Sequence, residues 1–299
     1  MEKKYESVTL DEIARRFPTK EACLEYIAGR KWHDGFSCIR CRHKRYSNGM
    51  KYLDRQCNNC HYIESPTANT LFHKVKFSLV KAFRIVHLVS TTKTGIASTT
   101  LSRLLGLRQK TCHLFKLKVM QAMRHQEGLD RCLEGLVEVG VFETGNVYKS
   151  AKGEKKSTRR KILLGIEKKG KGVSRMEAVS CCKATCRKYE EFIMSRVANG
   201  SRIEAENKPS LRHIDPDKEC KLFLTDPKEN KGRFTRMVRV RTLLTNRLKA
   251  IHGHVKYLDY YLAEYSYRHN RFYMKGEILD DLLSRMIGHA PRPRLSLIM

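Results

Sequence analysis

The chain has 299 residues and carries 60 Lys and Arg against 31 Asp and Glu, which gives a formal net charge of +29. Its hydrophobic content of 41% is enough to bury a core, so wholesale disorder is excluded. A charge this large repels itself unless a polyanion neutralises it, and nucleic acid fits that need better than an acidic membrane surface does.

The sequence also bears on where the protein resides. Its apolar runs stay short of the roughly 18 residues that a membrane-spanning helix needs. The segment Met1–Phe17 lacks the apolar region of a signal peptide. These features predict a soluble, cytoplasmic protein with no membrane partner. Eleven cysteines in a reducing compartment indicate metal ligation and buried thiols rather than disulfide bonds.

Residues 1–64 are expected to form two short helices followed by a zinc ribbon. Two Cys-x-x-Cys pairs lie fifteen residues apart, and each pair lets a tight knuckle present two sulfurs to one ion. The intervening length suits a β-hairpin with Asn48-Gly49 as its turn. Four thiolates leave no open position for water, so a structural Zn²⁺ is predicted. Its ligands are expected to be Cys38, Cys41, Cys57 and Cys60.

Residues 65–127 are expected to be helical, with helices at Ser78–Thr92, Ile96–Leu105 and Arg108–Met123. Gly106 ends the second helix, and the short connection to the third is typical of a helix-turn-helix. Leu104 is expected in its core. The alternative is an ordinary three-helix bundle with a solvated basic face. The expected contacts to double-stranded DNA are Arg103, Arg108, Gln109, Lys110, Thr111, His113, Lys116 and Lys118.

Residues 128–299 mix strands and helices, so the chain as a whole is predicted to be an α+β multidomain protein. The order is three strands, a helix, one or two strands, and then helices, which is the order of a ribonuclease-H-like fold. That fold cuts or joins nucleic acid with two metal ions held by carboxylates. The expected strands are Leu136–Glu143, Lys161–Ile166, Val173–Val179, Arg202–Ala205 and Lys221–Leu224; the expected helices are Lys183–Val197, Phe234–Ile251, Tyr257–Tyr273 and Glu277–Met286.

Six segments, in this order, resemble one family. They are Phe17–Cys38, Thr70–His73, Gly95–Ser98, Gln109–Cys112, Val137–Gly145 and Tyr257–Arg271. Together they resemble the bacterial insertion-sequence transposases with an N-terminal zinc ribbon, the ISXO-type or fifteen-ninety-five family. The resemblance covers nearly the whole chain. It implies a bacterial, nucleoid-associated protein that acts on DNA with Mg²⁺, alone, as a homodimer or in a nucleoprotein complex.

The departures from the family concern its metal-binding residues. Its first Asp aligns with Gly140, its second with Glu206, and its late-helix position and following Lys with Leu243 and Thr245. A site without the first Asp cannot hold two metals in the inherited geometry, so a domesticated or decayed transposase without strand-transfer activity is predicted. One alternative is an active, Mg²⁺-dependent transposase, in which Glu138 or Glu143 replaces the lost acid. The other is a structural subunit of a nucleoprotein assembly.

A basic segment lies within the last domain. Lys149–Lys171 carries ten Lys and Arg against two Glu, a net charge of +8. Two interpretations stay open for it. The segment is either a solvated hairpin and loop or an arm that contacts phosphates.

Overall fold

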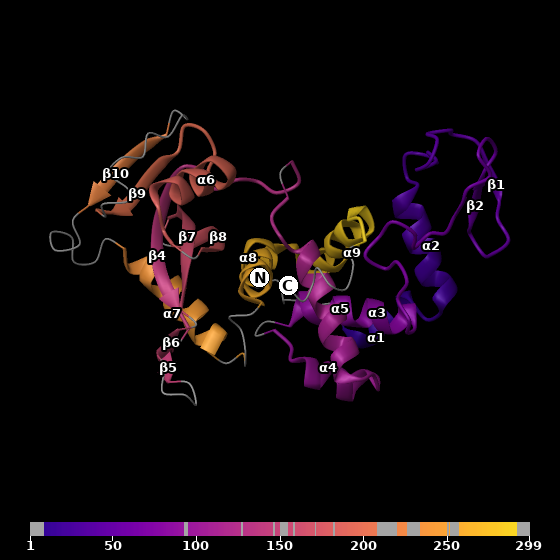
Figure 1. Ribbon diagram of the computed structural model, residues 1–299, viewed down its shortest axis with the longest axis horizontal. Helices are drawn as coiled ribbons and strands as arrows, with labels where there is room; N and C mark the ends of the chain where they lie inside the picture. The colour runs from indigo at the N-terminus through magenta and orange to yellow at the C-terminus, as the bar shows by residue number, and fades with distance from the viewer. Residues whose placement is uncertain are drawn as a thin grey trace, which may run out of the picture. The chain divides into compact units, whose positions relative to one another are not determined.

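The computed structural model describes residues 9–92, 95–126, 128–145, 147–149, 155–157, 159–170, 172–181, 183–207, 220–225, 234–249, 251 and 257–291 (Figure 1). The fold is α+β, and the chain divides into two compact units. Unit 1 comprises residues 1–123 and 272–299, and unit 2 comprises residues 124–271. This division differs from the three expected segments (1–64, 65–127 and 128–299), because residues 1–123 group as one unit and residues 272–299 belong to that unit as well.

Unit 1 begins with two short helices, α1 (Leu10–Arg16) and α2 (Lys20–Lys31). A threonine caps each of them, because Thr9 Oγ1 accepts a hydrogen bond from the backbone of Glu12 and Thr19 Oγ1 accepts one from Ala22, both at 3.2 Å. A three-stranded sheet follows, in the order β1 (Tyr46–Asn48), β2 (Arg55–Cys57) and β3 (Ile63–Glu64).

The helices α3 (Leu79–Thr91), α4 (Ser98–Leu105) and α5 (Gln109–Ala122) complete the N-terminal part of unit 1. The 3₁₀ helix η3 (Phe272–Glu277) and α9 (Ile278–Gly288) return to it from the far end of the sequence. Asp280 of α9 accepts hydrogen bonds from Arg16 at 2.8 and 2.6 Å and from the Tyr26 hydroxyl at 2.5 Å. Helix α9 therefore closes the N-terminal core, which explains why it does not group with unit 2.

Unit 2 is built on a five-stranded sheet in the order β10-β9-β4-β7-β8. The strands β4 (Leu136–Thr144), β7 (Arg160–Lys169) and β8 (Gly172–Cys181) are antiparallel neighbours. On the other side of β4, β9 (Arg202–Glu206) runs parallel to it, and β10 (Lys221–Thr225) runs parallel to β9. The expected element order is therefore present.

Helices cover this sheet. Helix α6 (Cys186–Arg196) buries Tyr189, Phe192 and Ile193 against one face, and α7 (Thr235–Lys249) packs on β4. Helix α8 (Leu258–Arg271) lies along the edge strand β8. There the Asn270 side chain donates to the carbonyl of Met176 at 2.9 Å and accepts from its N–H at 2.8 Å. The backbone groups that an edge strand exposes are thus paired at this point.

A small two-stranded sheet, β5 (Val147–Lys149) and β6 (Lys155–Ser157), stands apart from the large one. It connects β4 to β7 and continues from their ends (Figure 1). Of the expected basic segment Lys149–Lys171, residues 150–154, 158 and 171 lie outside the described residues. Among the helices that the structure describes, none has both the length and the apolar character needed to cross a bilayer.

Candidate metal centre and nucleic-acid interface

The four predicted cysteines come together in unit 1. The sulfurs of Cys38 and Cys60 are 3.6 Å apart, those of Cys41 and Cys57 are 3.5 Å apart, and all four lie within 4.8 Å of one another. A tetrahedral ion with Zn–S bonds of about 2.3 Å places its sulfurs about 3.8 Å apart. The cluster can therefore hold one metal ion, and its all-sulfur donor set is compatible with structural zinc.

The two knuckles repeat one backbone geometry. In the first, the Arg42 N–H donates to the Cys38 carbonyl at 2.8 Å, and in the second the His61 N–H donates to the Cys57 carbonyl at 3.0 Å. Arg42 and His61 each adopt a left-handed conformation, with φ of 62° and 55°. A tight turn of this kind at both pairs brings the four sulfurs to a common centre.

The hairpin between the knuckles is confirmed, but its turn differs from the expectation. Strand β1 pairs antiparallel with β2, while Asn48-Gly49 is not a two-residue turn. The connection spans residues 49–54, and the Gly49 N–H donates to the Asp54 carbonyl at 2.7 Å. A Cβ added at Gly49 would lie 2.7 Å from Cβ of Asp54, so glycine is required by close approach rather than by a left-handed φ.

Backbone hydrogen bonds lower the pKa values of two of the cluster's thiols, whereas burial raises them. A backbone hydrogen bond from His43 lowers the pKa of the Cys41 thiol to about 6. A backbone hydrogen bond from Tyr62 acts in the same direction on Cys60, yet burial and the three neighbouring sulfurs raise the pKa of that thiol to about 12. Four thiolates at this separation repel one another, and a divalent cation at their centre would remove that repulsion.

The helix pair α4–α5 carries the residues expected to contact DNA. Gly106 ends α4 in a left-handed conformation (φ 59°), and the Ser102 hydroxyl donates to the Leu107 carbonyl at 2.6 Å, which fixes the short connection. Four of the expected contact residues are exposed at this connection and at the start of α5, whereas three farther along α5 are half-buried. The exposed ones are Arg103, Arg108, Gln109 and Lys110; the half-buried ones are Thr111, His113 and Lys118.

Two residues of this segment differ from the expectation. Lys116 is buried, with 7% of its surface exposed, and its ammonium group donates to the carbonyl of Ile96 at 2.7 Å. It therefore holds the backbone that precedes α4, and it does not belong to the exposed basic face. Leu104 was expected in the core but is 57% exposed, because it lies on the solvent side of α4 beside Arg103.

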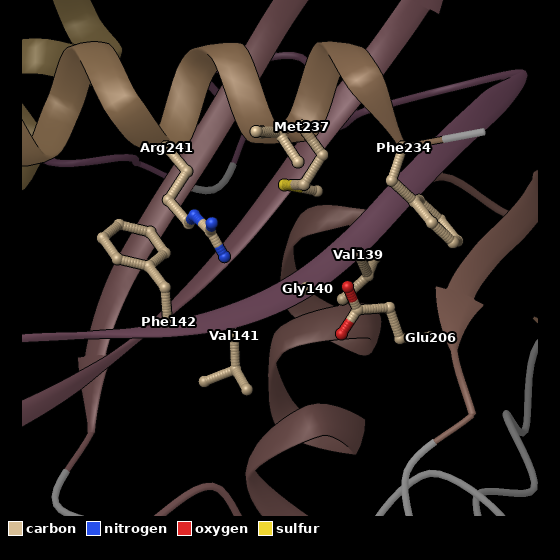
Figure 2. A pocket seen from close by; sticks show the side chains of 9 residues that line it. Val139, Gly140, Val141, Phe142, Glu206, Phe234, Met237 and Arg241 are labelled. Carbon is tan, nitrogen blue, oxygen red and sulfur yellow. The ribbon is translucent and has the colours of Figure 1, made fainter. Parts of the chain in front are cut away.

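In unit 2, the positions aligned with the first two metal-binding acids lie side by side. The parallel register pairs Glu138 with Glu204 and Val139 with Ala205, so Gly140 and Glu206 follow at the same level of the sheet. Figure 2 shows Glu206, Met237 and Arg241 around Gly140. A Cβ added at Gly140 would lie 3.7 Å from the sulfur of Met237.

This recess is mainly apolar. Besides Glu206 and Arg241, it is lined by Val139, Gly140, Val141, Phe142, Phe234, Met237 and Val238. Within the described part of the chain, the four cysteines form the one group of three or more His, Cys, Asp or Glu residues close enough to share a metal ion. The described residues around Gly140 therefore do not form such a group.

The late-helix positions predicted from the sequence do not face this recess. Leu243 is 53% exposed and Thr245 is half-buried, and neither of them lines the recess. Met237 and Arg241, nearer the start of α7, face the recess instead. The side of α7 that meets the sheet could have been found from the spacing of its apolar residues. The buried residues of α7 are Met237, Val240, Leu244 and Leu248.

The two glutamates offered as replacement acids are engaged elsewhere. Glu138 has 0% of its surface exposed and forms an ion pair with Lys168 at 2.9 Å. The same ammonium group lies 3.5 Å from the carboxylate of Glu204. Glu143 is exposed, on the opposite face of β4, and lies 3.9 Å from Arg159. A lysine therefore already occupies the space between the two buried carboxylates.

Comparisons with known proteins do not identify a family for this chain. No family model matches the chain, and no curated protein sequence does. Among solved structures, a chain of the simian T-cell lymphotropic virus intasome in complex with PP2A regulatory subunit B56 gamma has a TM-score of 0.31 and 11% identity. The match covers 61% of this chain and 65% of that chain, slightly less than two thirds of its length. A similarity this low identifies neither the fold nor the function.

Proposed function

We propose that this chain is a DNA-binding protein descended from a zinc-ribbon transposase, and that it no longer performs strand transfer. The observation that carries the DNA-binding part is the helix pair α4–α5, which exposes Arg103 in the last turn of α4, Arg108 just before α5, and Gln109 and Lys110 at the start of α5. A helix-turn-helix places the first residues of its second helix against base edges and uses neighbouring cations for phosphates. The net charge of +29 favours the same polyanionic partner.

The four-cysteine cluster supports the ancestry. We propose that it binds one structural Zn²⁺, which supplies folding free energy of about 10–16 kcal/mol to a segment with a small core of its own. Trp32, Phe36 and Leu53 pack around its cysteines and continue that core. The ion has no catalytic part in this proposal, because all four of its positions are taken by sulfur.

The strand order of unit 2 supports a ribonuclease-H-like ancestor. On one side of its central strand β4, β7 is antiparallel to β4 and β8 is antiparallel to β7; on the other side, β9 and β10 run parallel to β4. Gly140 and Glu206, at one level of that sheet, correspond to the positions where such enzymes hold metal ions with carboxylates. Gly140 has no side chain, and Met237 lies over it, which favours loss of the two-metal reaction.

The salt dependence of duplex affinity tests DNA binding. Each phosphate contact contributes about −0.9 to the slope of log affinity against log salt. Arg108→Ala and Lys110→Ala should each reduce the magnitude of the slope by up to about 0.9, and a residue that contacts bases should also change sequence preference. Arg187→Ala, which removes an exposed cation from α6, is the matched control and should leave the slope unchanged.

Two outcomes would contradict the proposal. A wild-type slope near zero would exclude phosphate neutralisation as the source of binding. Strand-transfer or nicking product formed with Mg²⁺ or Mn²⁺ on candidate terminal repeats, and abolished by Glu206→Gln, would show that the transposase reaction survives. Duplex binding that requires a partner protein would favour the alternative of a structural subunit in a nucleoprotein assembly.

A further inference from the structure

Helix α7 carries a charge pattern that differs from that of its neighbours in unit 2. Its 15 residues include five Lys and Arg and no Asp or Glu. Helices α6 and α8 each mix acidic and basic residues. Arg236 even lies in the first turn of α7, where the positive end of the helix macrodipole disfavours a cation. The charges of α7 are therefore not arranged to stabilise the helix itself.

Three of these five cations point toward other parts of unit 2. The guanidinium group of Arg236 donates to the carbonyl of Gly170 at 2.8 Å. Arg247 forms an ion pair with the buried Glu264 at 3.2 Å. Arg241 lines the recess described above (Figure 2). The two remaining cations of α7 lie on its outer side.

That outer side is a polar stripe of five residues, called here the outer stripe: Thr235, Arg239, Thr242, Asn246 and Lys249. They recur at spacings of four and three residues, which places them on one side of an α-helix. All five are exposed, and the buried residues of α7 occupy the opposite side. Within the described part of the chain, the side chains of Arg239 and Lys249 have no hydrogen-bond or ion-pair partner. Both charges are therefore available to a ligand.

Helices α7 and α6 lie on opposite faces of the large sheet. Val137 and Val139 of β4 belong to the core cluster that includes Phe192 of α6. Gly140, the next residue of β4, faces Met237 of α7 instead. Because successive residues of a strand point to opposite faces, the two helices cover different sides of unit 2. Cations on α6 therefore provide a control for cations on α7 within the same unit.

We propose that the outer stripe of α7 is a binding site for duplex DNA in unit 2, and that it contacts the phosphate backbone. Arg239 and Lys249 are ten residues apart, which is about 15 Å along an α-helix. Duplex DNA carries one negative charge per about 1.7 Å of its axis, so both cations meet phosphates. Thr242 and Asn246 between them are neutral groups that can donate to phosphate oxygens. The inference shares its ligand with the proposed function, but it does not depend on the α4–α5 pair.

The experiment compares two double variants of the full-length protein on a duplex of about 30 base pairs. The stripe variant carries Arg239→Gln and Lys249→Gln. The control carries Lys183→Gln and Arg187→Gln, which remove the same charge from exposed positions before and at the start of α6. Affinity is measured between about 50 and 200 mM salt, and circular dichroism checks that each variant is folded.

With two phosphate contacts removed, the stripe variant should lose up to about 1.8 from the magnitude of the slope of log affinity against log salt. Its affinity would then fall up to about 12-fold less over this salt range than that of the wild type. The control should keep the wild-type slope. In the wild-type protein, duplex should also protect Lys249 but not Lys183 from acylation, as measured by mass spectrometry. This protection should persist in the Arg108→Ala and Lys110→Ala variants.

An unchanged slope for the stripe variant, an equal change in the control, or a Lys249 that stays reactive with duplex bound would each overturn the inference. Protection of Lys249 by self-association or by an acidic protein, but not by duplex, would overturn it as well and would assign the stripe to a protein partner.

The failure of the stripe is distinguishable from the failure of the proposed function. If Arg108→Ala and Lys110→Ala reduce the slope while the stripe variant does not, DNA binding by α4–α5 stands and the stripe is a solvated helix face. If the stripe variant alone reduces the slope, unit 2 binds DNA and the role proposed for α4–α5 is wrong. A flat wild-type slope would contradict both.

Discussion

Two glycines in neighbouring strands of unit 2 should respond in opposite ways to an added methyl group. At Gly140, a Cβ would meet only the flexible end of Met237, at 3.7 Å, which is an ordinary van der Waals distance. At Gly165, it would lie 2.8 Å from Cδ1 of Leu133 and 3.0 Å from Cε1 of Phe192. Both of those side chains are buried, so they must shift within a packed core.

These distances set the expected magnitudes. Glycine inside a strand costs about 0.5–1 kcal/mol relative to alanine, so Gly140→Ala should leave the free energy of unfolding unchanged or raise it by up to about that amount. Overpacking a core costs about 1–3 kcal/mol, so Gly165→Ala should lower the free energy of unfolding by that amount. Gly165→Ala is thus the matched control for the same chemical change in the same sheet.

Equilibrium unfolding in urea, followed by circular dichroism, measures both variants. The predicted order is that Gly140→Ala unfolds at or above the wild-type midpoint and Gly165→Ala clearly below it. If Gly140→Ala is as destabilising as Gly165→Ala, packing on β4 would require glycine at position 140. Glycine at position 140 would then be explained by packing alone and would not support the proposed loss of strand transfer.

Two further predictions concern metal content and pH. Cys41→Ser should reduce bound zinc from one ion per chain to near zero, as measured by atomic emission on purified protein. The control Cys132→Ser, in unit 2, should leave the zinc content at one ion per chain. Equal zinc content in both variants would contradict the four-thiolate assignment. Burial lowers the pKa of His87 below 6.5, so the unfolded chain takes up the proton first and stability should fall as pH drops below about 6.5. The urea midpoint of His87→Gln should therefore decline less between pH 7.5 and 5.5 than that of the wild type, and an identical decline would show that this histidine does not contribute.

Local signals in the sequence predicted local structure well. The two Cys-x-x-Cys pairs and their spacing were enough to predict the four-cysteine cluster, because each knuckle is a tight turn that involves few residues. Thr9 and Thr19 cap α1 and α2 through hydrogen bonds to residues three positions later, which is also a local signal. The five strands of the large sheet were predicted in their correct order, although β7 and β8 each extend beyond the expected bounds, whereas β5 and β6 were not predicted.

Features that depend on distant parts of the chain were not predicted. Lys116 has the charge of a surface residue on α5, and its burial depends on a backbone carbonyl twenty residues earlier. Helix α9 follows unit 2 in the sequence, yet the hydrogen bonds of Asp280 to Arg16 and Tyr26 tie it to the N-terminal helices. Neither partner can be identified from composition or periodicity along one segment.

Under the proposed ancestry, the charges on the sheet of unit 2 account for the replacement of a metal-binding surface by a structural ion pair. Glu138 and Glu204 lie opposite each other on the parallel strands, and two buried carboxylates at this distance repel unless a cation lies between them. Lys168 now supplies that positive charge from within the chain. A divalent ion would have to displace this ammonium group before it could use either carboxylate, and Gly140 offers it no ligand. Among the described residues, Glu206 has no second carboxylate at its own level of the sheet, so two-metal chemistry here would require changes at position 140 and around Met237 together.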